Sequence, residues 1–130
     1  WVNQMLQPVV QKQLSYFKDS FTLNNNMEQL CLPCGALLFT CDATSMYTNI
    51  PTDIALQAIL TYLRANENTI FHHYDSNALI KALQIIFNNN FIQFGDTYWQ
   101  QILGTGMGIS PALPWATIFY ALHEQQFLPD

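Results

Sequence analysis

Asp42 is the residue whose position in this sequence most clearly suggests chemistry. It ends the apolar run of residues 36–41 (Ala-Leu-Leu-Phe-Thr-Cys), and polar turn-forming residues follow it directly. An unpaired carboxylate at a buried strand end is costly or takes up a proton, and a bound metal ion is the usual partner that makes it tolerable. Residues 36–42 are therefore predicted to form a buried strand that ends in a metal-ligating carboxylate. The alternative is an Asp42 that only caps the next turn.

A second segment with chemical potential is the glycine loop, residues 104–108 (Gly-Thr-Gly-Met-Gly). Glycines at alternate positions allow close backbone approach, and a loop that opens a helix offers unpaired N–H groups to phosphate. No Lys-Ser or Lys-Thr pair follows Gly108, so this is not a Walker loop, and the spacing does not match G-x-G-x-x-G. The alternative is a plain turn between a hairpin and a helix.

The three cysteines could support redox or zinc chemistry. Cys31 and Cys34 have the C-x-x-C spacing, and Cys41 is left over. A second half for a zinc site is missing, because His72 and His73 are adjacent and cannot easily bind one ion together. Reduced, structural cysteines in an intracellular protein are the simpler expectation. A small soluble α/β protein with a Cys31/Cys34 redox pair is a further alternative, which thiol titration would separate.

The composition limits the classes of protein to which this chain can belong. The chain has 130 residues, half of them hydrophobic, a tenth charged, and a formal net charge of −5. The length is enough for one domain, and the high share of hydrophobic residues argues against disorder. An autonomous nucleic-acid binder would normally carry a basic patch, and the four basic residues are scattered singly. Such a low share of charge suggests a surface that is partly meant to be covered.

Neither a membrane segment nor a signal peptide is expected. No apolar run approaches the ~20 residues that cross a bilayer, and the start, Trp1-Val2-Asn3-Gln4, has no basic or apolar leader region. We therefore expect no membrane partner and an intracellular location, nuclear or cytoplasmic. The simplest expectation from the missing initiator Met is that both ends are cut from a longer polypeptide.

Helical periodicity organises much of the chain. Residues 4–17 are predicted to form a helix with Pro8 as a kink or start, and Asp19 or Ser20 to cap a short helix that runs towards residue 30, followed by a turn at 33–35. Thr52 is predicted as an N-cap, with the helical face that follows made of Ile54, Ala55, Ala58, Ile59, Tyr62 and Leu63.

The next elements are a loop, a helix and a hairpin. Residues 66–74 are predicted as a loop. Ser76 is predicted to cap a helix on Ala78, Leu79, Leu83 and Ile86, which the Asn triplet 88–90 can terminate because Asn tolerates left-handed geometry. Residues 91–94 and 97–103 are predicted to pair around Gly95-Asp96. Four aromatic residues of this hairpin are predicted to pack against other side chains rather than to stack on a ligand: Phe91, Phe94, Tyr98 and Trp99. An apolar helix over 113–127 follows.

Three segments resemble a known family. Residues 38–51 read Leu-Phe-Thr-Cys-Asp-Ala-Thr-Ser-Met-Tyr-Thr-Asn-Ile-Pro, which resembles the first catalytic motif of reverse transcriptases in the form carried by Penelope-like retroelements. Residues 101–108 resemble the next motif, Gly-Thr-Ala-Met-Gly, and residues 15–20 are similar to the stretch that precedes the first. The matches are in family order and span most of the chain.

The resemblance implies an RNA-directed DNA polymerase with two Mg²⁺ ions, or Mn²⁺ in their place, and with RNA template, DNA primer and dNTP as partners. Asp42 would be one metal-holding, catalytic carboxylate, with the Ala43 carbonyl near the second ion. The nucleotide-binding residues would be Thr44, Ser45, Met46 and Tyr47, with Tyr47 excluding a 2′-hydroxyl by steric conflict. The template and primer would be contacted by Gly104, Thr105, Gly106, Met107 and Gly108.

The fold that the resemblance implies is a partial polymerase palm with part of the fingers, α/β (α+β) in content, with helices packed on a small, mostly antiparallel sheet. It would be one partial domain over 1–130: a helical lead-in (1–35), the first palm strand and turn (36–51), two helices (52–90), the hairpin (91–103), and the glycine loop with its helix (104–130). The missing remainder of the polymerase domain would be a further partner.

Departures from the family pattern lead to an alternative to the polymerase interpretation. Ala43 stands for the common Val, Gly106 for Ala, and residues 109–114 (Ile-Ser-Pro-Ala-Leu-Pro) lack an expected lysine. The later aromatic-x-Asp-Asp hairpin is not found in these residues, and one carboxylate cannot hold two divalent ions, so the chain alone is predicted to be inactive. The alternative is a decayed or co-opted retroelement relic that acts as a non-enzymatic interaction module.

Overall fold

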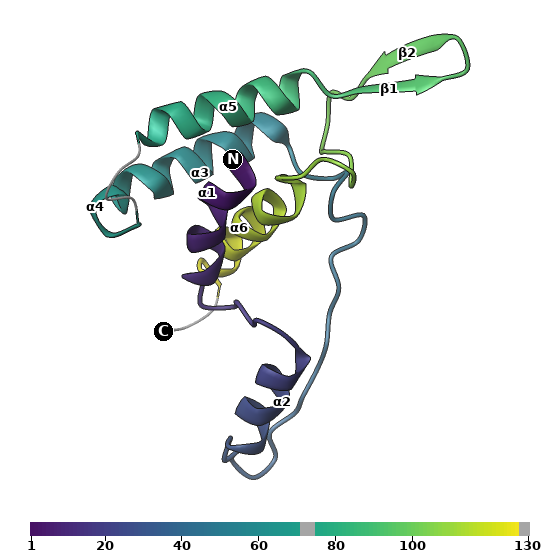
Figure 1. Ribbon diagram of the computed structural model, residues 1–130. Coiled ribbons are helices and arrows are strands. Elements are labelled where there is room, and N and C mark those ends of the chain that lie inside the picture. Colours follow the sequence, from purple (N-terminus) through teal and green to yellow (C-terminus); the bar gives the residue numbers. More distant parts are fainter. Residues whose placement is uncertain (71–74, 128–130) are drawn as a thin grey trace.

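The computed structural model describes residues 1–70 and 75–127 (Figure 1). Within these residues the chain forms six helices and one two-stranded antiparallel sheet, so the α+β content predicted from the sequence is confirmed. In chain order the elements are α1 (Val2–Gln11), α2 (Ser20–Glu28), α3 (Thr52–Ala65), α4 (Glu67–Ile70), α5 (Ser76–Asn88), β1 (Phe91–Phe94), β2 (Thr97–Gln100) and α6 (Ala112–Glu124).

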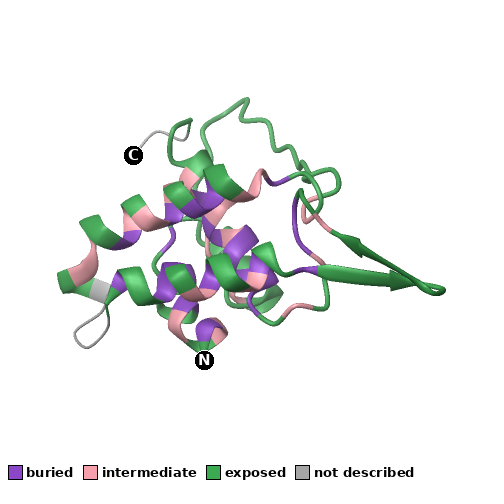
Figure 2. Cartoon of the chain, turned by 90° about the horizontal axis from the view of Figure 1, so that it is seen from above, coloured by how far each residue is buried: buried purple, intermediate pink, exposed green. Residues whose placement is uncertain are grey.

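The core lies between α1, α3, α5 and α6 (Figures 1 and 2). Each of α3 and α5 buries residues four positions apart, Ile59 with Leu63 and Leu79 with Leu83, because that spacing places them on one helical face. Trp115 of α6 is fully buried, and its ring centroid lies 4.4 Å from that of Phe87. These four helices form the body on which the glycine loop and the turn after Asp42 are mounted.

The predicted helix starts are close to those observed, with the capping residue shifted in two cases. Asp19 caps α2, as predicted, by accepting a hydrogen bond from the Thr22 N–H (2.8 Å). For α3 the N-cap is Pro51 and not Thr52, and for α5 it is Asp75, which accepts from the Asn77 N–H (2.8 Å), and not Ser76. Asp is as favourable as Ser at an N-cap position, so the sequence alone could not decide whether Asp75 or Ser76 caps α5.

Several predicted boundaries were wrong. The first helix ends at Gln11 rather than residue 17, and Pro8 lies inside it. The end of α5 at Asn88, by contrast, lies within the predicted Asn triplet, although the Asn89 C-cap has φ −116° and is not left-handed. A short helix, α4, occupies part of the loop predicted over 66–74, and residues 71–74 of that loop lie outside the described residues. Pro8 is the seventh residue of α1, so its missing N–H removes the intrahelical hydrogen bond to the Gln4 carbonyl.

Residues 36–42 form no strand, which corrects the prediction of a buried one. They belong to the arm, a name we use for residues 18–44, in which every residue except the partly buried Thr22 is exposed. Leu37 and Phe39 are 93% and 83% exposed. A strand forms only beside another strand, and the described part of the chain places no strand next to this segment. The arm therefore consists of α2, which lies away from the body, and an extended segment that leads back to it (Figure 1).

The hairpin is confirmed, but its aromatic residues are not buried. β1 pairs with β2 from Phe91 opposite Gln100 to Phe94 opposite Thr97, around Gly95 with φ +60°. β2 ends at Gln100, three residues before the predicted end. All eight strand residues are exposed, because the hairpin projects beyond the helices and no second layer within residues 1–70 and 75–127 covers it (Figure 2). The prediction that its four aromatics pack in a core was therefore wrong.

Candidate functional site

The turn that follows Asp42 is held in an unusual backbone conformation. Ser45 has φ +51° and is the one described non-glycine residue with positive φ. Its carbonyl oxygen accepts hydrogen bonds from the Thr48 N–H (3.0 Å), the Asn49 N–H (3.1 Å) and the Thr48 hydroxyl (3.2 Å). The Asn49 side chain also donates to the Thr44 carbonyl (3.0 Å). These bonds offset the left-handed geometry, which costs an L-residue about 1–2 kcal/mol.

The glycine loop docks against this turn. The Thr105 N–H donates to the Tyr47 carbonyl (2.8 Å), and the Gly104 N–H donates to the Ile50 carbonyl (3.0 Å). Gly104 has φ +70°, which favours glycine. The structure therefore brings together the two segments that the sequence singled out, residues 44–50 and the start of 104–108.

Contacts with the four-helix body hold the turn at residues 44–50 in place. Ile50 is fully buried, while Met46 and Tyr47 are half-buried and pack against the core. From α6, the Tyr120 hydroxyl donates to the Met46 carbonyl (3.3 Å). Sequence reasoning assigned no role to Ile50 or Tyr120, and the apolar residue before Pro51 was the one signal that pointed to such an anchor.

Asp42 and Ala43 lie at the edge of this arrangement, where the arm joins the turn. Both are exposed. A cavity of about 260 Å³ lies beside Ala43 and is also lined by Ser15, Tyr120 and Glu124. Within residues 1–70 and 75–127 no three His, Cys, Asp or Glu side chains gather as a metal site. The residues present thus do not fit a pair of divalent ions, since Asp42 supplies a single carboxylate.

Thr44 and Ser45 offer backbone amides to a ligand. Both residues are exposed, and their N–H groups donate to no partner among the described residues. Successive free amides in a turn that includes a left-handed residue form a concavity suited to anions. These two amides are therefore available to an anion, close in sequence to the half-buried Tyr47.

The rest of the glycine loop divides into a buried and an exposed half. Thr105 is buried, and its Oγ1 has no hydrogen-bond partner in the described part of the chain. A Cβ at Gly106 would lie 3.8 Å from the Asn90 side-chain oxygen. Met107 and Gly108 are exposed. The loop therefore presents its second half to solvent while its first half is fixed to the turn.

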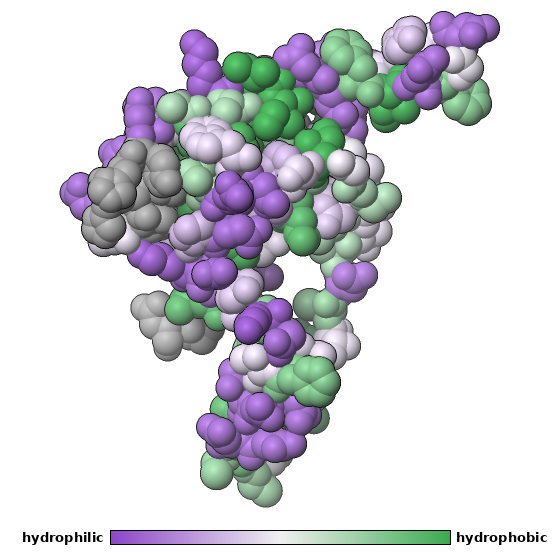
Figure 3. Space-filling view, viewed as in Figure 1, coloured by the Kyte–Doolittle hydropathy of each residue, from purple (hydrophilic) through white to green (hydrophobic). Residues whose placement is uncertain are grey.

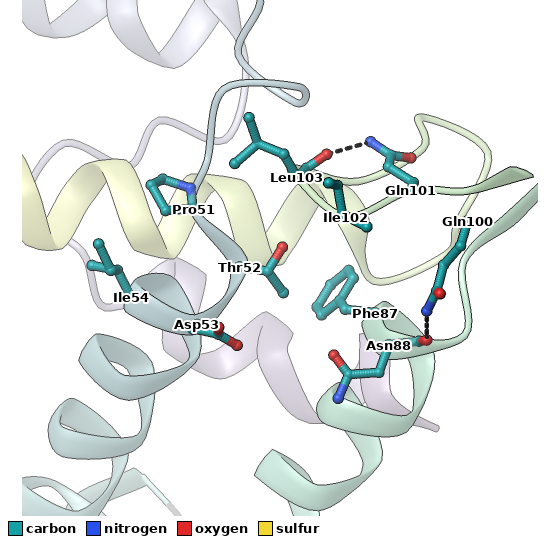
Figure 4. Close-up of a pocket in the computed structure, with 10 residues that line it drawn as sticks. All are labelled: Pro51, Thr52, Asp53, Ile54, Phe87, Asn88, Gln100, Gln101, Ile102 and Leu103. Carbon is teal, nitrogen blue, oxygen red and sulfur yellow. Dashed lines mark hydrogen bonds between the residues drawn. The ribbon is translucent and has the colours of Figure 1, made fainter.

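A larger cavity, of about 440 Å³, opens between the first turn of α3, the end of α5 and the segment after β2 (Figure 4). Asp53 is the acidic residue of its lining. Two hydrogen bonds fix its wall, from Gln100 Nε2 to the Asn88 carbonyl (2.7 Å) and from Gln101 Nε2 to the Leu103 carbonyl (2.8 Å). Sequence reasoning did not identify this cavity, because its lining comes from three separate segments.

The cysteines form no cluster that could support the redox or zinc alternatives. Cys31, Cys34 and Cys41 are free and exposed on the arm. The adjacent His72 and His73 lie outside the described residues. The predicted Pro33–Gly35 turn, which includes Cys34, is confirmed by the bond from the Ala36 N–H to the Pro33 carbonyl (3.1 Å).

None of the helices in residues 1–70 and 75–127 combines the length and the apolar character needed to span a bilayer. The chain matches no protein-family model, and it has no significant match among curated proteins or among solved structures.

Proposed function

We propose that this chain is part of a reverse transcriptase of the Penelope-like retroelement type, an RNA-directed DNA polymerase that adds deoxynucleotides to a primer. The observation that carries the proposal is the junction of the two motif segments, made by the bonds from Thr105 to Tyr47 and from Gly104 to Ile50. A polymerase must hold the incoming nucleotide beside the template, and this junction sets the residues proposed for each task side by side.

In this proposal the turn contacts the nucleotide. The free amides of Thr44 and Ser45 receive triphosphate oxygens, since backbone N–H groups in a left-handed turn bind anions. The Tyr47 ring lies under the sugar and rejects a 2′-hydroxyl by contact. Its half-buried position against the core would keep the ring fixed, which a steric filter requires.

The glycine loop contacts the template strand and the new base pair. Met107 and Gly108 form its outward half, and the absence of bulky polar side chains there permits close approach of a base. The formal charge of −5 indicates that this part binds nucleic acid weakly by itself, so basic surface must come from the rest of the polymerase. Such a parent protein would act in the nucleus or the cytoplasm.

Asp42 contributes one carboxylate to the proposed catalytic centre. Mg²⁺ held by a full set of carboxylates activates a primer 3′-hydroxyl and stabilises the leaving pyrophosphate. Since no such set gathers within the described residues, we assign no catalytic step to this chain by itself. Its own contribution is to position nucleotide and template.

The first test is the reading frame that follows the Asp130 codon. An open frame that reaches an aromatic-x-Asp-Asp hairpin is the expected result. A stop codon, or a frame without the acidic pair, would instead favour a non-enzymatic relic that works by binding. The exposed apolar side chains of the hairpin support that alternative, because such patches often mark interaction sites.

The second test is primer extension on an RNA template by the full-length parent protein. Asp42→Asn is expected to lower the rate at least about a hundredfold, while Asp96→Asn, at the exposed hairpin turn, leaves it unchanged. Tyr47→Ala is expected to raise incorporation of ribonucleotides relative to deoxynucleotides, and Tyr47→Phe, which keeps the ring, is not. Full activity in Asp42→Asn would refute the proposal.

A further inference from the structure

We propose that Asn90 and Gln101 are positioning residues for the glycine loop. Their side chains, which we call the amide pair, hold the peptide group between Leu103 and Gly104, at which the loop begins. Neither residue has a role in the proposed function. The hold on the peptide group follows from contacts within the chain, whereas its consequence for template binding rests on the proposed function.

The amide pair lies at the base of the hairpin, where the chain passes into the glycine loop. Asn90 and Gln101 flank Phe91 and Gln100, the last paired residues of the two strands. The Gln101 N–H donates to the Asn90 carbonyl (2.9 Å), and Asn90 Nδ2 donates to Gln101 Oε1 (2.7 Å). Asn90 is buried, which strengthens a hydrogen bond relative to water. The hairpin projects from the body (Figure 3), and these bonds close its base.

The bond from Asn90 decides which way the Gln101 side chain faces. A carboxamide has one acceptor end and one donor end, and Asn90 Nδ2 occupies the acceptor end of Gln101. The donor end, Nε2, therefore faces the loop, where it donates to the Leu103 carbonyl oxygen (2.8 Å; Figure 4). The two side chains thus form a directed chain of hydrogen bonds that runs from the hairpin base to the first peptide group of the loop.

The peptide group between Leu103 and Gly104 is held at both of its ends. Its carbonyl oxygen accepts from Gln101, and its N–H donates to the Ile50 carbonyl (3.0 Å). The C=O and N–H of a trans peptide point in opposite directions, so a flip of this group breaks both bonds together. Gly104 has φ +70°, but a glycine adopts positive and negative φ with similar ease and does not fix the conformation by itself. The two hydrogen bonds are therefore what opposes a flip.

The amide pair also supports the middle of the loop. A Cβ at Gly106 would lie 3.8 Å from Asn90 Oδ1 and 3.9 Å from Gln101 Oε1, which is ordinary van der Waals contact. The backbone of Gly106 therefore passes close to the same two side chains that hold the first peptide group. Two points of the loop thus depend on one pair of residues, and the exposed Met107 and Gly108 follow directly after the second point.

The docking of the loop on the turn depends on this peptide group. A flipped group would present a carbonyl oxygen to the Ile50 carbonyl, and two acceptors that face each other repel. The next bond, from the Thr105 N–H to the Tyr47 carbonyl (2.8 Å), lies one residue further along and would be lost with it. The outward half of the loop, which the proposed function places on the template, would then no longer be fixed. Gln101 therefore acts on the template through the loop, without contacting the template itself.

Amide hydrogen exchange, followed by NMR on the 130-residue chain, tests the hold on the peptide group. The amides of Gly104 and Thr105 should be protected in the wild type. Gln101→Glu keeps the acceptor for Asn90 but loses the donor to Leu103, so protection at both amides is expected to fall at least about tenfold. Gln101→Met, which adds no charge, is expected to give the same loss and decides the test if the charged variant does not fold. Unchanged protection in the folded variants would overturn the proposal.

Gln100→Glu is the matched control. The Gln100 side chain also donates to a main-chain carbonyl, that of Asn88 (2.7 Å), but this carbonyl lies at the end of α5 and not in the loop. The variant adds the same charge one residue away, and protection of Gly104 and Thr105 is expected to stay within about twofold of the wild type. An equal loss in Gln100→Glu and Gln101→Glu would show a general effect of charge at the hairpin base and would refute the proposal.

Asn90→Asp tests whether Asn90 acts through Gln101. At pH 8 the new carboxylate accepts hydrogen bonds and donates none, so it attracts Gln101 Nε2 away from the Leu103 carbonyl. Protection of the Gly104 amide is expected to fall although Gln101 itself is unchanged. Full protection in this variant would overturn the role of Asn90. Far-UV circular dichroism checks that each variant keeps its helices.

Primer extension by the full-length parent protein tests the consequence for the template. Gln101→Glu is expected to raise the KM for the template–primer at least about fivefold and to leave kcat within about twofold, because the loop contacts the template and not the reacting atoms. Gln100→Glu should change neither. A lower kcat with an unchanged KM would refute the role of Gln101 in template positioning. A wild-type parent without polymerase activity would refute the proposed function, while the exchange results decide the hold on the peptide group by themselves.

Discussion

Gly104 lies directly against the backbone of Thr48, at the junction of the glycine loop and the turn after Asp42. A Cβ atom at position 104 would lie 2.6 Å from Thr48 Cα and would also overlap the Tyr47 carbonyl oxygen. The φ of +70° is a second reason why a side chain is unfavourable here. A glycine at this position is therefore required by the contact between the two segments, whatever ligand they bind.

Gly104→Ala is accordingly expected to destabilise the fold by at least about 2 kcal/mol, through backbone overlap and positive-φ strain together. The groups that the new methyl would meet are backbone atoms, which cannot turn aside as a flexible side chain can. Urea unfolding followed by far-UV circular dichroism measures the change in the free energy of unfolding.

Gly108→Ala is the matched control for this prediction. No atom lies within 4 Å of a Cβ built at Gly108, and its φ is not positive. A change within about 0.5 kcal/mol is expected. If the two variants have equal stabilities, the junction between loop and turn does not exist in solution.

Trp115 allows a prediction that separates packing from hydrogen bonding. The residue is fully buried beside Phe87, and its Nε1–H has no partner among the described residues. Trp115→Ala is expected to cost about 3–5 kcal/mol through the cavity that it leaves. Trp115→Phe keeps a ring and removes an unpaired buried donor, so about 1–2 kcal/mol is expected. Equal losses in thermal unfolding experiments would mean that the indole N–H has a partner, such as a buried water.

The sequence predicted the elements whose stability is local or comes from one helical face. The Asp19 cap, the helices that carry Leu63 and Leu83, and the turn at Gly95 depend on residues close in the chain or on a 3.6-residue period. These features need no knowledge of the partners across the core. They were predicted almost to the residue, with errors of one position at the caps.

The sequence was misleading where burial had to be inferred from hydrophobicity. Leu37 and Phe39 read as a buried strand, and Phe94 and Trp99 as packed aromatics, yet all four are exposed. A strand or a sheet face is buried only if another element covers it, and periodicity within one segment cannot supply that element. The meeting of the turn and the glycine loop was not predicted, since no local pattern links Tyr47 to Thr105.

The Asp19 cap makes the start of α2 sensitive to acid. Its carboxylate accepts from the Thr22 N–H (2.8 Å) and hydroxyl (2.9 Å), and these bonds, the backbone one first, lower the pKa of Asp19 below its ordinary value of 3.8. A lowered carboxylate pKa gives stabilisation that is complete above the unfolded pKa and is lost as the pH falls through the folded one. We expect the ¹³Cα shifts at the start of α2 to move towards coil values below about pH 4.

Asp19→Asn provides the control for this acid effect. Asn is an equally good N-cap and does not titrate. The helix start in this variant should therefore show little change over the same pH range. An identical acid transition in both proteins would assign the effect to another group.

The final prediction concerns divalent ions. Since Asp42 is exposed and no three metal-ligating side chains gather within the described residues, millimolar Mg²⁺ or Mn²⁺ should leave the thermal midpoint of the 130-residue chain unchanged. A ligand that binds only the folded state raises its stability by RT ln(1 + [L]/Kd), so a constant midpoint means that Kd lies well above the ion concentration. Primer extension by this chain should likewise be undetectable. A midpoint that rises with Mg²⁺ in the wild type and not in Asp42→Asn would show instead that the chain completes a metal site by itself, with Asp42 as a ligand.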